Sequence, residues 1–150
     1  MKTYLTTALF LMFNLCMISC GTSQNKSDSR KATTEEIMNT LNNTSWVLQR
    51  IDEQNRDFNP TEDQKELILS FQDNRYSTSD GCNGQGGEFE VKDNQINFIK
   101  GMSTLRYCGE EMVHLIYKIP FDKIKSVQII KDKLQFLDEN SNIIATYIKK

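Results

Sequence analysis

The sequence has little of what identifies several large classes of protein. Beyond residue 19 it has no run of the roughly 20 apolar residues that a membrane-spanning helix needs. Its 18 basic residues are outnumbered by 20 acidic ones, whereas nucleic-acid phosphates require clustered lysine and arginine. It has one histidine, two prolines and no internal repeat. These features argue against an integral membrane protein and against a nucleic-acid-binding protein.

The first 19 residues have the composition of an export signal. Lys2 provides a positive start, and the stretch from Leu5 to Ile18 is apolar apart from three polar residues. Such a segment is a targeting peptide rather than part of the fold. We predict that residues 1–19 are a signal peptide. Their removal takes away one basic residue and no acidic residue, which leaves a net charge of −3.

The end of this leader, Ser19-Cys20-Gly21, resembles a bacterial lipobox, in which the cysteine is acylated and becomes the first residue of the mature protein. The resemblance implies that lipid on Cys20 anchors the protein to a membrane, since two or three acyl chains together hold a protein there stably. Without an acidic residue after Cys20, we expect the outer membrane of a bacterial cell envelope. An ordinary secretory signal with a free Cys20 is the alternative.

Residues 20–42 are expected to form a lipidated start and a flexible tether, because polar segments bury too little apolar surface to offset their ordering entropy. A short helical turn over Thr34 to Leu41, capped by Thr34, is predicted within this segment. Residues 43–150 remain, a length that normally forms one domain.

Alternating apolar and polar residues indicate that this domain is mainly β-strand. Trp46, Leu48 and Arg50 are expected on one face of the first strand. Asp93-Asn94 predicts a tight hairpin. The predicted strands cover residues 46–51, 67–71, 76–78, 86–91, 95–99, 127–130, 134–137 and 143–148.

Between Glu110 and Tyr117 the apolar spacing becomes helical, and Pro120 ends or kinks that helix. An antiparallel sheet must hide its edges, and curling around one helix does so. We therefore predict an α+β fold, a curled antiparallel sheet of about seven to eight strands packed with one main helix.

Three separated motifs resemble the META domain, also called the HslJ-like domain, of bacterial lipoproteins. The motifs are Trp46-Val47-Leu48, the stretch from Ser79 to Asn83, and the stretch from Met102 to Cys108. The resemblance implies a cracked barrel similar to that of secretin pilotins. The positions that match the family pattern are Trp46, Gly81, Cys82, Asn83, Thr104, Arg106 and Cys108.

The resemblance also implies a disulfide between Cys82 and Cys108. Export to an oxidising compartment agrees with that bond, and closing a loop of about 27 residues would stabilise the fold by roughly 3.5 kcal/mol. Two free thiols and a metal site stay open as alternatives. A zinc site normally has four nitrogen or sulfur ligands, so we expect neither a metal nor a cofactor.

No catalytic constellation stands out. Cys108 and His114 would need a third group to orient them. Glu88 and Glu90 share a strand face that has the alternation of a solvated surface. The glycine-dense stretch from Gly81 to Gly87 lacks the lysine of a phosphate-binding loop, and a strand connection with a bulge explains it.

These features together predict a non-enzymatic, lipid-anchored envelope protein that binds a protein or an apolar ligand, or helps to maintain the envelope. The candidate ligand groove lies between sheet and helix and is lined by Phe89, Phe98, Leu115 and Tyr117. The alternative is a small envelope enzyme or a thiol–disulfide active protein that uses Cys82 and Cys108.

Overall fold

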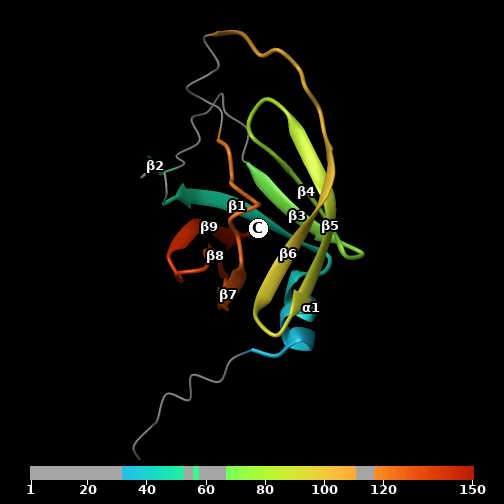
Figure 1. Ribbon diagram of the computed structural model, residues 1–150, viewed down its shortest axis with the longest axis vertical. Helices are drawn as coiled ribbons and strands as arrows, with labels where there is room; N and C mark the ends of the chain where they lie inside the picture. The colour runs from blue at the N-terminus through green and yellow to red at the C-terminus, as the bar shows by residue number, and fades with distance from the viewer. Residues whose placement is uncertain (1–31, 53–55, 58–66, 111–116) are drawn as a thin grey trace, which may run out of the picture.

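The computed structural model describes residues 32–52, 56–57, 67–110 and 117–150. They form an eight-stranded antiparallel barrel with the order β1-β3-β4-β5-β6-β7-β8-β9, which closes where β9 pairs with β1 (Figure 1). A two-residue strand, β2, extends the pairing of β1. The strands are β1 (Thr44–Ile51), β2 (Arg56–Asp57), β3 (Ile68–Gln72), β4 (Arg75–Ser79), β5 (Gly84–Lys92), β6 (Gln95–Ser103), β7 (Ser126–Ile130), β8 (Lys133–Leu137) and β9 (Ile143–Lys149).

The predicted fold class, a curled antiparallel sheet with a helix, is confirmed. Each predicted strand is present within one or a few residues of its expected ends. The helix in the described part of the chain is α1 (Thr34–Leu41). The main helix predicted between Glu110 and Tyr117 lies, apart from these two residues, outside the described residues.

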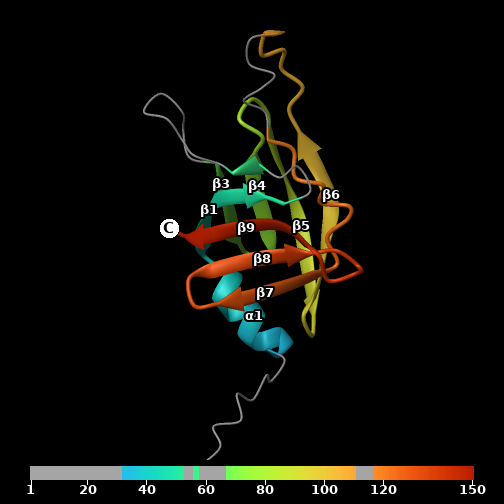
Figure 2. The same ribbon diagram turned by 90° about the vertical axis from the view of Figure 1, so that its left-hand side faces the viewer.

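Helix α1 covers one end of the barrel (Figure 2). Thr33, rather than the predicted Thr34, is its cap: its hydroxyl accepts from the Glu36 N–H at 3.3 Å, while the Glu36 carboxylate accepts from the Thr33 N–H at 2.9 Å. Ile37 and Leu41 are 3% and 0% exposed in the core. Folded structure therefore begins within the segment expected as tether. No helix among the described residues is long and apolar enough to cross a membrane.

Large apolar side chains from most of the strands fill the barrel. Trp46 is fully buried, and its indole N–H donates to the Thr44 hydroxyl at 2.8 Å. Complete burial of one such side chain contributes about 1.5–3 kcal/mol. A chain of ring contacts crosses the interior, with centroids 4.8 to 5.7 Å apart, through Tyr76, Phe98, Phe121, Phe136 and Tyr147.

One predicted side-chain direction in β1 is wrong. The pairing of β1 with β9 shifts register between Leu48 and Arg50, so the alternation of inward and outward side chains changes phase there. Ile51 is buried instead of Arg50, and the Arg50 guanidinium pairs with Asp52 at 2.8 Å and with Asp57.

The barrel is cracked between β6 and β7. Among the described residues these strands pair only at Gln95 and Ser126. Beyond that point they separate, because β7, β8 and β9 run across the direction of β5 and β6 (Figure 2). One side of β6 is therefore paired with β5 along most of its length, while the other side lies at the crack.

Candidate functional site

A tight turn between β4 and β5 organises the end of the barrel opposite α1. The Asp80 carboxylate accepts hydrogen bonds from the backbone N–H groups of Cys82 at 2.9 Å and Asn83 at 2.6 Å. Gly81 has a φ of 98°, a left-handed conformation that favours glycine. Gly81 thus adopts the left-handed conformation that the turn requires, and the side chain of Asn83 points out of the turn to bind a second segment.

The Asn83 side chain binds residues 104–108, which we call the strap. The Asn83 carbonyl oxygen Oδ1 accepts from the Thr104 hydroxyl at 2.9 Å and from the Arg106 N–H at 2.6 Å. Its amide nitrogen Nδ2 donates to the Arg106 C=O at 3.3 Å. One side chain therefore satisfies backbone groups on a segment more than 20 residues away, which fixes the strap against the turn.

Further bonds tie the strap at both ends. The Thr104 N–H donates to the Gly84 C=O at 2.9 Å, and the Arg106 guanidinium donates to the Cys82 C=O at 3.0 Å. A disulfide joins Cys82 to Cys108, with Cα atoms 6.1 Å apart. The predicted bond is therefore confirmed, and it leaves neither sulfur as a free thiolate.

The strap exposes the side chains that the turn does not hold. Thr104, Arg106 and Cys108 contact the turn, whereas Leu105 and Tyr107 between them are 96% and 81% exposed. Just before the strap, Met102 at the end of β6 is 84% exposed. Single exposed apolar residues are ordinary, but three within six consecutive residues, here called the cluster, are typical of an interaction site.

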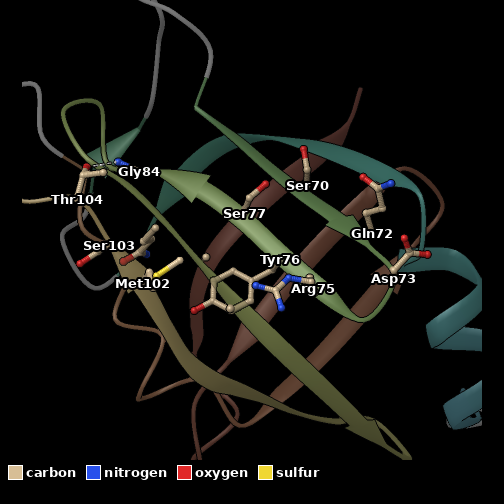
Figure 3. Close-up of a pocket in the computed structure, with 13 residues that line it drawn as sticks. Ser70, Gln72, Asp73, Arg75, Tyr76, Ser77, Gly84, Met102, Ser103 and Thr104 are labelled. Carbon is tan, nitrogen blue, oxygen red and sulfur yellow. Dashed lines mark hydrogen bonds between the residues drawn. The ribbon is translucent and has the colours of Figure 1, made fainter.

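A shallow hollow adjoins this cluster on the outer face of β3, β4, β5 and β6 (Figure 3). Its volume is about 650 Å³. Glycines leave its floor without side chains, and Met102 stands at one side. Burial raises the pKa of Tyr76, which also borders it. The other lining residues are mostly small or polar: Ser70, Gln72, Asp73, Arg75, Ser77, Gly84, Gln85, Gly86, Gly87, Ser103 and Thr104.

A second groove lies between α1 and β7, far from the strap. Ile37, Val127, Ile129 and Leu137 provide apolar walls, and the groove has a volume of about 740 Å³. Ile130 at its rim is 53% exposed. Phe89, Phe98 and Tyr117, the described members of the predicted ligand groove, do not line this space.

The sequence profile of the META domain matches residues 39–148. This chain belongs to the META domain family. The match runs from within α1 to the penultimate residue of β9, so it includes all strands of the barrel. The three motifs that suggested the family have different positions in this META domain. Trp46 lies in the core, whereas the other two motifs form the turn and the strap, which contact each other.

Two solved structures share the fold of this META domain. One is the NMR structure of a protein from Burkholderia xenovorans, with 21% identity and a TM-score of 0.50, covering 75% of this chain and 86% of that chain. The other, also an NMR structure, has 16% identity and a TM-score of 0.52, covering 73% of this chain and 92% of that chain. Comparison with curated proteins gives no match.

The predicted apolar groove is not formed by the residues that we assigned to it. Phe89 and Tyr117 are only 2% and 7% exposed, and Phe98 packs against the same core. The rings of Phe71 and Phe121 fill the neighbouring space, with centroids 4.9 Å from Phe89 and 4.8 Å from Phe98, respectively. Leu115, the fourth predicted residue, lies outside the described residues.

The remaining residues that the sequence singled out are either exposed or outside the described residues. Glu88 and Glu90 are exposed, and Glu88 forms an ion pair with Arg75 at 3.5 Å. Cys20 and His114 lie outside the described residues. Sequence reasoning missed Leu105 and Tyr107, although their alternation with the family positions Thr104, Arg106 and Cys108 could have identified them as outward-facing.

Proposed function

We propose that this protein is a lipid-anchored envelope protein whose META domain is non-enzymatic and binds another protein through Met102, Leu105 and Tyr107. The observation that supports this proposal is the exposure of Met102 at the end of β6 and of Leu105 and Tyr107 on the strap, which is held by a disulfide and by the Asn83 hydrogen bonds. Leaving these side chains in water is unfavourable, and a partner would relieve that cost.

A protein partner suits this surface better than a small apolar ligand. Leu105 and Tyr107 are exposed on the strap and line neither the hollow nor the second groove, so they can enter pockets on a partner but do not enclose a ligand. Aromatic and methionine side chains are enriched at the centres of protein interfaces. Because the strap is already fixed by the turn, binding orders little additional backbone, which lowers the entropic cost of association.

The placement of the strap agrees with an anchored protein. The strap and α1 lie at opposite ends of the molecule in both views (Figures 1 and 2). If Cys20 carries lipid, a link of about 13 residues precedes α1, with a typical reach of roughly 20 Å. The strap then faces away from the membrane, toward other envelope proteins.

The alternative function is thiol–disulfide exchange by Cys82 and Cys108. A reactive pair is reduced near the thioredoxin potential of about −270 mV, whereas a structural disulfide resists reduction below about −300 mV. We expect the structural behaviour, because the bond is part of the contacts that fix the strap. A redox titration of the purified protein followed by thiol alkylation distinguishes the two functions.

Two experiments in cells test the proposed function. Mass spectrometry of the mature protein should find acyl chains on Cys20, and Cys20→Ala should move the protein out of the membrane fraction. A photo-crosslinking amino acid at Leu105 or Tyr107 should give a discrete protein adduct, whereas the same group at Ile130 gives none. No adduct at the strap, or the same adducts at all three positions, contradicts the proposal.

A further inference from the structure

We infer that the partner binds by strand addition: an extended segment of another protein pairs with the free edge of β6. The free edge is the side of residues 97–103 that faces away from β5, where no other described residue makes a backbone hydrogen bond. The added segment would place apolar side chains against Met102, Leu105 and Tyr107. This inference rests on the proposed function, because it specifies how the partner is bound.

The hydrogen-bond pattern shows which backbone groups of β6 face the crack. In an antiparallel pair, the N–H and C=O of one residue point to the same side. The Phe89 N–H donates to the Asn74 C=O at 3.0 Å, toward β4. Phe98, directly opposite Phe89 on β6, therefore directs its own N–H and C=O away from β5.

The same reasoning applies at the other end of the free edge. The Thr104 N–H donates to the Gly84 C=O at 2.9 Å, toward β5. Ser103, one residue earlier and exposed, therefore directs its backbone groups to the free edge. Within the described residues, β7 pairs with β6 only at Gln95, and the Ile96 N–H donates to the Lys125 C=O at 3.1 Å.

The free edge has the length and chemistry that an extended peptide requires. Seven residues in a strand span about 23 Å, close to the length of a typical strand. An unpaired strand edge is a template for another strand, since its donors and acceptors are already aligned. Met102 lies near the end of this edge, and Leu105 and Tyr107 follow it in the sequence, so the segment that pairs with the edge can bury apolar side chains at one end.

A second copy of this chain fits the free edge poorly. Two copies of β6 related by a two-fold axis would pair antiparallel. Met102 and the strap of one copy would then lie across from the beginning of β6 in the other copy, where Gln95 and Asn97 are exposed and polar. The apolar cluster would gain little, which favours a segment from a different protein.

The test uses purified mature protein and a phage-displayed library of random peptides of about 12 residues, longer than a typical strand. We expect selected peptides with alternating apolar residues. Binding should protect the amide protons of Phe98 and Ser103 from hydrogen exchange. Methylation of one peptide nitrogen that faces β6 should weaken binding about tenfold, the cost of one lost hydrogen bond, whereas methylation of an adjacent nitrogen, which faces away from β6, should have little effect.

Two protein variants separate the backbone from the side chains. Ser103→Pro removes an outward N–H while leaving the pairing with β5 intact, and it should weaken peptide binding about tenfold. The double substitution Leu105→Ser and Tyr107→Ser should abolish binding, whereas Ile130→Ser, a matched change at a distant exposed residue, should not. Unfolding in urea checks that all three variants remain folded.

The outcomes distinguish the two proposals. If peptide binding requires Leu105 and Tyr107 but is unaffected by Ser103→Pro and by every N-methylation, strand addition is wrong and the proposed function stands. Selection of helical peptides, or no selection at all, also overturns strand addition. Concentration-dependent dimers that Ser103→Pro abolishes would assign the free edge to a second copy and overturn the choice of occupant.

Discussion

Asn83 and Arg106 are joined by two hydrogen bonds of opposite direction: the amide oxygen of Asn83 accepts from the Arg106 N–H at 2.6 Å, and its amide nitrogen donates to the Arg106 C=O at 3.3 Å. A side-chain amide here pairs with the backbone as a neighbouring strand would. The relationship explains why an asparagine follows Cys82, since aspartate has no N–H to donate and serine is too short to make both bonds.

Replacement of Asn83 should therefore destabilise the protein. Asn83→Ala removes the bonds to Thr104 and Arg106, and we expect a loss of roughly 1–2 kcal/mol in the free energy of unfolding. Asn140→Ala, at an exposed turn, should change that free energy by less than about 0.5 kcal/mol. Urea unfolding measures both. Equal effects of the two substitutions would contradict the role assigned to Asn83.

The disulfide should make a comparable or larger contribution. Substitution of both Cys82 and Cys108 by alanine should lower the free energy of unfolding by roughly 3.5 kcal/mol, because the unfolded chain regains the freedom of a loop of about 27 residues. Reduction of the unaltered protein should have a similar effect. A loss below about 1 kcal/mol in urea unfolding would show that the turn and strap hold together without the bond.

Two glycines of the sheet should differ in their tolerance of alanine. A Cβ on Gly101 would overlap the carbonyl oxygen of Gly86, because β6 bulges against β5 at this point. Gly101→Ala should therefore cost about 1–3 kcal/mol or more. A Cβ on Gly84 would lie 3.9 Å from its nearest neighbour, the Thr78 carbonyl oxygen, so Gly84→Ala should stay within about 0.5 kcal/mol. Thermal unfolding compares them directly.

Alkaline pH should destabilise the fold through Tyr147. Complete burial raises the pKa of this phenol above its ordinary value of 10.0. Above pH 10 the unfolded chain loses this proton while the folded protein keeps it, so the free energy of unfolding falls as pH rises. Tyr147→Phe should reduce that fall, whereas Tyr107→Phe on the exposed strap should not. Urea unfolding between pH 8 and about 11.5 measures the slopes.

The local pattern of the sequence predicts the strands well. Alternation places Leu69, Phe71 and Phe89 in the core, and they are buried. It fails at Arg50 because a change of register within β1 depends on the pairing with β9, almost 100 residues away. The two-residue β2 is too short to leave any periodic signal.

The site was harder to predict than the fold. Alternation indicates that Phe98 points inward, but it does not show whether the interior is open or filled by Phe121. The family pattern identifies Asn83 and Arg106, but their contact spans 23 residues and no local rule reveals it. The crack at β6 also depends on the relative direction of strands, which sequence spacing leaves undetermined.

The pairing of β1 with β9 has a consequence for biosynthesis. Lys149 lies opposite Trp46, so the barrel joins the beginning of the domain to its final strand. A nascent chain that still lacks β9 has unpaired edges on β1 and β8, and such edges attract other chains. Folding should therefore wait until β9 is available to pair, and a chaperone that keeps the polypeptide extended until then would protect it from aggregation.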